Sequence, residues 1–158
     1  MKAASLNEIR KELVNLDQAS LTQLCVSLAR FKKDNKELLS YLLFEAGNET
    51  AYIKDVKHDL DELFETVPKG NVYFIKKGIR KILRLLNKQI KYSGAPQTEL
   101  DLRIYFCVKI KAAGIPIHHH GTVLHNLYQQ QVKKIRAVLS KLPEDLQFDY
   151  AVALEKIK

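Results

Sequence analysis

Apolar residues recur three and four positions apart along most of this chain, and that spacing gathers them on one face of an α-helix. The pattern is clearest between residues 72 and 92, in Ile75, Ile79, Ile82, Leu83, Leu86 and Ile90. Residues that cap a first helical turn precede several such segments, as Ser5 does three positions before Glu8. Glycine and proline fall in the gaps, where helices end. We therefore expect a mostly helical chain.

These signals predict about eight helices. They are expected at residues 5–16, 20–31, 35–46, 49–66, 72–92, 98–113, 122–141 and 143–157. Short connections between neighbouring helices favour antiparallel pairs. The sixth segment is apolar on nearly every side, so we expect it to be buried in the middle of the fold. Its β-branched and aromatic residues leave a strand over 103–110 as an alternative.

The fold class predicted from this pattern is all-α: a compact array or bundle of about eight short antiparallel helices with a buried sixth helix. A chain of 158 residues, 46% of them apolar, fits one globular domain over residues 1–158. No apolar run is long enough for a signal peptide or a membrane span, so no membrane partner is expected. Two cysteines without a CxxC spacing are typical of a reduced, cytoplasmic protein.

Charge divides the chain into two unequal halves. Residues 1–66 carry 9 basic and 12 acidic side chains, whereas residues 67–158 carry 17 basic and 6 acidic ones. The first half is thus mildly acidic and the second half strongly basic. Clustered lysine and arginine attract anions whatever the fold. We expect the second half to contact an anionic partner, either a nucleic-acid backbone or an acidic protein.

Ten basic residues of the second half form the candidate anion-binding set. They are Lys76, Lys77, Arg80, Lys81, Arg84, Lys88, Lys91, Lys133, Lys134 and Arg136. Five of them, from Lys77 to Lys91, are spaced four, three, four and three apart, which aligns them opposite the apolar face of the segment 72–92. An alternative is that acids of the preceding segment, from Asp55 to Glu65, occupy this row in ordinary surface ion pairs.

Four histidines gather within eight residues, at His118, His119, His120 and His125. Imidazole is a common zinc ligand, and a catalytic zinc needs three protein ligands. A metal-dependent enzyme built on His118, His120 and His125 is therefore an alternative function. However, no cysteine or carboxylate stands nearby to complete the site, and HExxH is absent. We expect a polar helix entrance that gains positive charge at low pH, with no metal and no cofactor.

No motif identifies a reaction. The chain lacks the GxGxxG, GxxxxGK[ST] and GxSxG patterns. Cys25 and Cys107 lie on apolar faces and are expected to be buried core residues. Glu99 and Arg103, four positions apart, are expected to form a structural pair near the core. We therefore expect no catalytic residue.

Three stretches carry a resemblance to known proteins. They are residues 35–46 (NKELLSYLLFEA), 78–84 (GIRKILR) and 144–150 (EDLQFDY). Together they resemble a family of small, uncharacterised all-helical bacterial proteins of similar length. The resemblance implies a bacterial cytoplasmic protein and carries over no activity and no site residue.

The sequence thus predicts a non-catalytic helical binding module whose basic second half contacts an anionic partner. A metal-dependent enzyme and a purely structural interaction module are the two alternatives. Nothing in the sequence indicates an oligomeric state.

Overall fold

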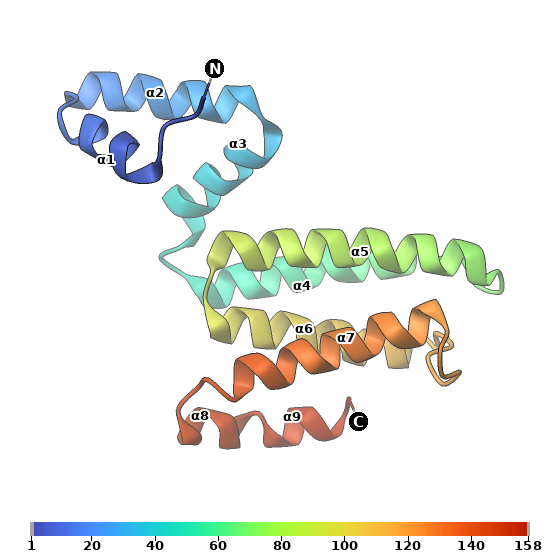
Figure 1. The fold of residues 1–158 in the computed structure, drawn as a ribbon. Coiled ribbons are helices and arrows are strands. Elements are labelled where there is room, and N and C mark those ends of the chain that lie inside the picture. Colours follow the sequence, from blue (N-terminus) through green and yellow to red (C-terminus); the bar gives the residue numbers. More distant parts are fainter. Residues whose placement is uncertain (1, 158) are drawn as a thin grey trace. The chain divides into compact units, whose positions relative to one another are not determined.

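The structure is a computed structural model, and it describes residues 2–157 (Figure 1). Every regular element in that part of the chain is a helix, which confirms the all-α fold class. The elements are α1 (Leu6–Val14), α2 (Gln18–Phe31), α3 (Lys33–Ser40), a π-helical turn (Tyr41–Glu45), α4 (Glu49–Glu65), α5 (Val72–Ser93), α6 (Pro96–Ala112), α7 (Val123–Leu139), α8 (Glu144–Asp149) and α9 (Ala151–Glu155).

Six of the expected helices end or begin within two residues of those in the structure, and the other two differ in more than their bounds. The segment expected at 35–46 is α3 followed by the π-helical turn, and α3 begins two residues earlier, at Lys33. The segment expected as one helix at 143–157 is divided into α8 and α9 at Tyr150. At that point the amide of Tyr150 lies 3.4 Å from the carbonyl oxygen of Leu146, so the helical hydrogen bond is long where the helix is interrupted.

The chain forms two compact units, residues 1–44 and residues 45–158, and each is described by itself. The boundary lies within the π-helical turn, well before the charge boundary at residue 66. A single domain over residues 1–158 stays a prediction. No helix in the described residues is long and apolar enough to cross a membrane.

The first unit consists of α1, α2 and α3, and α2 packs against α3. The capping box predicted at its start is confirmed, because the amide of Ser5 donates to Glu8 Oε2 at 2.7 Å and the amide of Glu8 donates to Ser5 Oγ at 3.3 Å. No side chain of residues 2–40 is buried. Cys25 is exposed, so the prediction that it belongs to the core is wrong. Three helices of 9, 14 and 8 residues enclose too little volume to cover it.

The second unit has its core around α6. This helix packs against α4, α5 and α7, while α4 and α5 lie side by side as an antiparallel hairpin (Figure 1). Leu100, Leu102 and Phe106 are fully buried, and the ring of Phe106 lies 5.8 Å from that of Phe64 in α4. The predicted buried sixth helix is confirmed. Residues 103–110 are part of it, so the alternative of a strand there is wrong.

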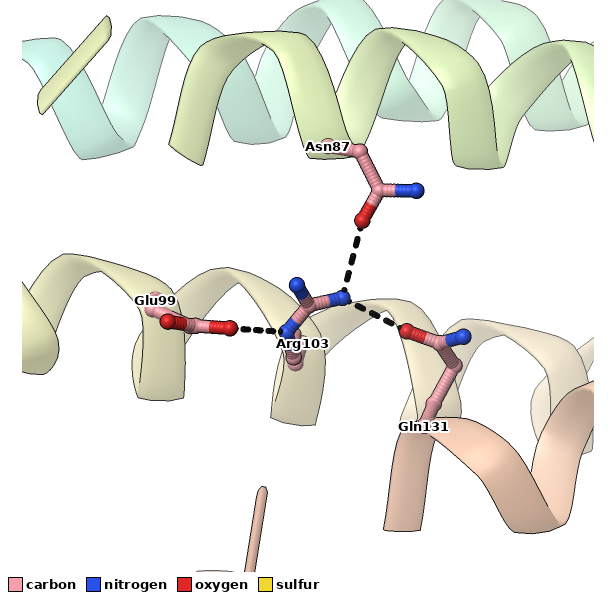
Figure 2. A network of polar contacts seen from close by, with 4 residues as sticks. All are labelled: Asn87, Glu99, Arg103 and Gln131. Atoms are coloured by element: carbon pink, nitrogen blue, oxygen red, sulfur yellow. Dashed lines mark hydrogen bonds and ion pairs between the residues drawn. The ribbon is translucent and has the colours of Figure 1, made fainter. Parts of the chain in front are cut away.

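A buried polar network joins α6 to two of its neighbours (Figure 2). Arg103 is 5% exposed, and its Nε donates to Glu99 Oε1 at 2.7 Å. Its Nη1 donates to Asn87 Oδ1 of α5 at 3.1 Å and to Gln131 Oε1 of α7 at 2.6 Å. The predicted pair of Glu99 and Arg103 is thus confirmed. The network holds three helices in register, and two of them carry the candidate anion-binding residues.

Candidate functional site

Helix α5 has two opposite faces. Ile79, Ile82 and Leu86 are fully buried against the core of the second unit. The Asn71 side chain caps the first turn, and Gly94 ends the helix in the left-handed region, at φ 65°, which glycine adopts without strain. These boundaries leave a helix of 22 residues with its opposite face turned to solvent.

Cationic side chains fill the solvent face of α5. The exposed ones, which we call the basic face of α5, are Lys77, Arg80, Lys81, Arg84 and Lys91. Lys76 and Lys88, also predicted for the set, are half-buried at its side. No acidic residue occurs between residues 72 and 93. Lys91 lies 14 positions after Lys77, so the face is roughly 21 Å long at about 1.5 Å per residue.

The acids of α4 do not neutralise this face. Within residues 2–157, none of the five residues of the basic face forms an ion pair with a carboxylate. Asp61 pairs instead with Lys109 of α6 at 2.8 Å, and Glu62 with His58 at 3.4 Å. Burial and the nearby Glu62 carboxylate raise the pKa of Asp59. Although α4 and α5 are antiparallel neighbours, the ion-paired alternative does not hold for these five cations.

The remaining candidates, Lys133, Lys134 and Arg136, are exposed on α7. None of them forms an ion pair within the described part of the chain. Helix α7 packs against α6, and α5 packs against α4 and α6. The ten predicted residues therefore belong to two groups on different helices. Arg136 has different neighbours again, because it lines a cavity together with histidines.

This cavity, which we call the histidine cavity, has a volume of about 440 Å³. The side chains that line it and can carry positive charge are Lys111, His118, His120, His125 and Arg136. His125 Nδ1 lies 2.7 Å from the carbonyl oxygen of Ile117, and its ring packs edge-on at 4.7 Å from the ring of His120. The cluster seen in the sequence is thus partly assembled in space, but His119 does not line the cavity.

A metal centre is not supported at these residues. Among residues 2–157, no group of three or more histidine, cysteine or acidic side chains is arranged to hold a metal ion. His118 and His120 line a cavity with Arg136 rather than with a carboxylate that would complete a metal site.

Sequence reasoning missed the link between Arg136 and the histidines. His125 and Arg136 lie eleven residues apart on α7, with Tyr128 and Val132 between them, and all four line the cavity. This 3–4–4 spacing is that of one helix face, so the signal was present in the sequence. The sequence alone does not show that the loop before α7 brings His118 and His120 to this face.

A second polar cluster that the sequence did not predict joins α4 to α6. The Tyr105 hydroxyl donates to the Asp61 carboxylate at 2.7 Å, and the ammonium groups of Lys57 and Lys109 lie 5.3 and 5.8 Å from the centre of the Tyr105 ring. Burial opposes ionisation of Asp61, but hydrogen bonds from Lys109 and Tyr105 lower its pKa. Burial and the Asp61 carboxylate raise the pKa of Tyr105 to about 12. Every charge in the cluster has a partner, so its role is structural.

Comparisons with protein-family models, with curated proteins and with solved structures found no match. The resemblance to small bacterial helical proteins therefore stays a prediction, and the argument for function rests on the surfaces described above.

Proposed function

We propose that this protein is a binding module, and that the basic face of α5 contacts the phosphate backbone of a nucleic acid. The observation that carries the proposal is the row of five exposed cations, from Lys77 to Lys91, without a carboxylate partner. Unpaired lysine and arginine release the counterions condensed on a nucleic acid when they meet its phosphates, and this drives binding without any base contact. A bacterial, cytoplasmic setting is part of the same proposal.

The shape of the face favours a phosphate backbone over an acidic protein. Phosphates follow one another about every 3.4 Å along one strand, so a row of roughly 21 Å is long enough to meet several of them. Protein interfaces place apolar and aromatic residues at their centre. The basic face has cations there, and the exposed aromatic residues near it, Tyr73 and Phe74, both lie at the start of α5. Tyr92, near the other end of this helix, is buried.

Salt dependence of binding to duplex DNA tests this proposal. If all five residues of the basic face neutralise a phosphate, log Kd should change with log salt by a slope of about 4.5, because each contact contributes about 0.9. Exchanging Lys77, Lys81 and Arg84 for Gln should flatten the slope by about 2.7. Two DNA duplexes of equal length and different sequence should bind with the same affinity, because phosphate contacts position the backbone without distinguishing bases. Fluorescence anisotropy at several salt concentrations measures both quantities.

The first unit offers a matched control. Lys11, Arg30 and Lys36 are exposed there, and replacing all three with Gln removes the same net charge outside the basic face. The control should keep the slope of the unaltered protein. Equal flattening in both triple variants would contradict the proposal and attribute binding to net charge alone. Absence of DNA and RNA binding, together with binding to a polyglutamate chain, would favour the acidic-protein partner.

A further inference from the structure

The lining of the histidine cavity combines an apolar wall with a cationic mouth. Ile117, Tyr128, Val132 and Ile157 are each less than 9% exposed, so they form its inner part. The histidines His118 and His120 and the guanidinium group of Arg136 are exposed at the opening. A ligand that fills this space must therefore have an apolar body and a charged end.

Among the described residues, every charged side chain that lines the cavity is basic. No carboxylate occurs among the described residues that line it. Arg136 forms no ion pair in that part of the chain, and the ammonium group of Lys111 donates to the carbonyl oxygen of Lys156 at 3.3 Å. The acid nearest in sequence to this wall, Glu155, ends α9 and is not part of the lining. The charged end of the ligand must be an anion.

His125 is held in a defined orientation. The carbonyl oxygen of Ile117 can only accept a hydrogen bond, so Nδ1 of His125 carries the proton of the 2.7 Å contact between them. This leaves Nε2 as the ring nitrogen available to a ligand. Nε2 accepts a hydrogen bond from the ligand when the ring is neutral and donates one when the ring is charged.

We propose that the histidine cavity binds a small organic phosphate, with the phosphoryl group against Arg136 and the histidines and the carbon body against the apolar wall. A volume of about 440 Å³ is that of a typical small-molecule site. Guanidinium recognises phosphate through paired hydrogen bonds. A phosphate monoester carries nearly two negative charges, so it matches several cationic groups better than a carboxylate, which carries one. The site shares no residue with the basic face of α5 and does not rest on its function.

Isothermal titration calorimetry with phenyl phosphate at pH 7 tests the site. Arg136→Gln should weaken binding by about tenfold or more, since it removes a charge-assisted contact. Lys134→Gln is the matched control, because Lys134 is exposed on the same helix and does not line the cavity. It should change the affinity less than about twofold. Inorganic phosphate should bind more weakly than phenyl phosphate to the unaltered protein, because it leaves the apolar wall uncovered.

The pH dependence gives an independent readout. Imidazole gains charge as the pH falls from about 8 to about 6.5, whereas a phosphate monoester keeps most of its second charge until about pH 6. Affinity for phenyl phosphate should therefore rise over this interval, and His118→Gln combined with His120→Gln should reduce the rise. Circular dichroism checks that each variant is folded.

Three results would overturn the inference. They are no saturable heat with phenyl phosphate up to about 10 mM, equal losses in Arg136→Gln and Lys134→Gln, and a pH dependence that the double histidine variant leaves unchanged. The triple Gln variant of α5 separates this site from the DNA-binding surface. It should bind phenyl phosphate as tightly as the unaltered protein, whether or not DNA binding itself is observed.

Discussion

Replacing Arg103 with Met should destabilise the second unit severely. The change keeps an unbranched side chain in the core but removes the donor on which three acceptors depend. The amide oxygen of Gln131 loses its partner in a residue that is 1% exposed, and the Glu99 carboxylate, with 25% of its side chain exposed, loses its ion pair. Removing one partner of a buried pair costs about 3–5 kcal/mol. We expect Arg103→Met to lower the free energy of unfolding by about 3 kcal/mol, the lower end of this range, because the Glu99 carboxylate is partly exposed to solvent.

Urea denaturation followed by circular dichroism measures this loss. The midpoint of the second unit should fall at an unchanged m-value, which reports a change of stability rather than of unfolded-state compactness. In a thermal scan the same loss should lower the melting temperature by roughly 10–15 °C for a unit of this size. Arg80→Met is the matched control, because Arg80 is exposed and without an ion pair in the described chain. It should change the unfolding free energy by less than about 0.5 kcal/mol.

A double-mutant cycle isolates the contribution of the pair. Glu99→Leu alone leaves the buried guanidinium without its carboxylate, whereas Glu99→Leu combined with Arg103→Met leaves neither charge unpaired. The double variant should therefore lose at least about 1 kcal/mol less than the two single losses added together. Additive losses would refute the coupling between Glu99 and Arg103 within α6. A loss in Arg103→Met that equals the loss in Arg80→Met would refute the view that this network holds the three helices together.

Further measurements examine other parts of the structure. In the native protein a thiol reagent should label the exposed Cys25 and not Cys107, because burial raises the pKa of the Cys107 thiol to about 12. Labelling of both thiols before unfolding would contradict the packing of α6. The pKa of Asp61 is lowered in the folded state, so Asp61→Asn should be less stable than the unaltered protein at pH 6. This difference in stability should vanish as the pH falls below about 4 and through the lowered pKa. A difference that persists at about pH 2 would refute this linkage. Amide hydrogen exchange should be much faster in residues 6–40 than in α6, because no side chain of residues 6–40 is buried. Equal protection of the two segments would show that another surface covers the first unit.

Local periodicity determined much of this fold. The 3–4 spacing of apolar residues predicted the buried and solvent faces of α5, because a helix of 3.6 residues per turn repeats its surface within a few positions. The same reasoning predicted that α6 is buried, since a helix that is apolar all round has no face to turn to water. The capping box at Ser5 and the pair of Glu99 and Arg103 are likewise contacts within one helical turn. Such features need no knowledge of the rest of the chain.

Tertiary structure decided everything that depends on a second helix. Cys25 has the apolar neighbours of a core residue, yet it is exposed because no element of its own unit covers that face. Asn87 and Gln131, which complete the Arg103 network, lie 16 and 28 residues away from it. The acids of α4 had the right spacing to pair with the basic face of α5, but Asp61 pairs with Lys109 of α6 and Glu62 with His58 of α4 itself. Periodicity predicts the helix face on which a side chain lies. The partner of that side chain depends on contacts between segments that are far apart in the chain.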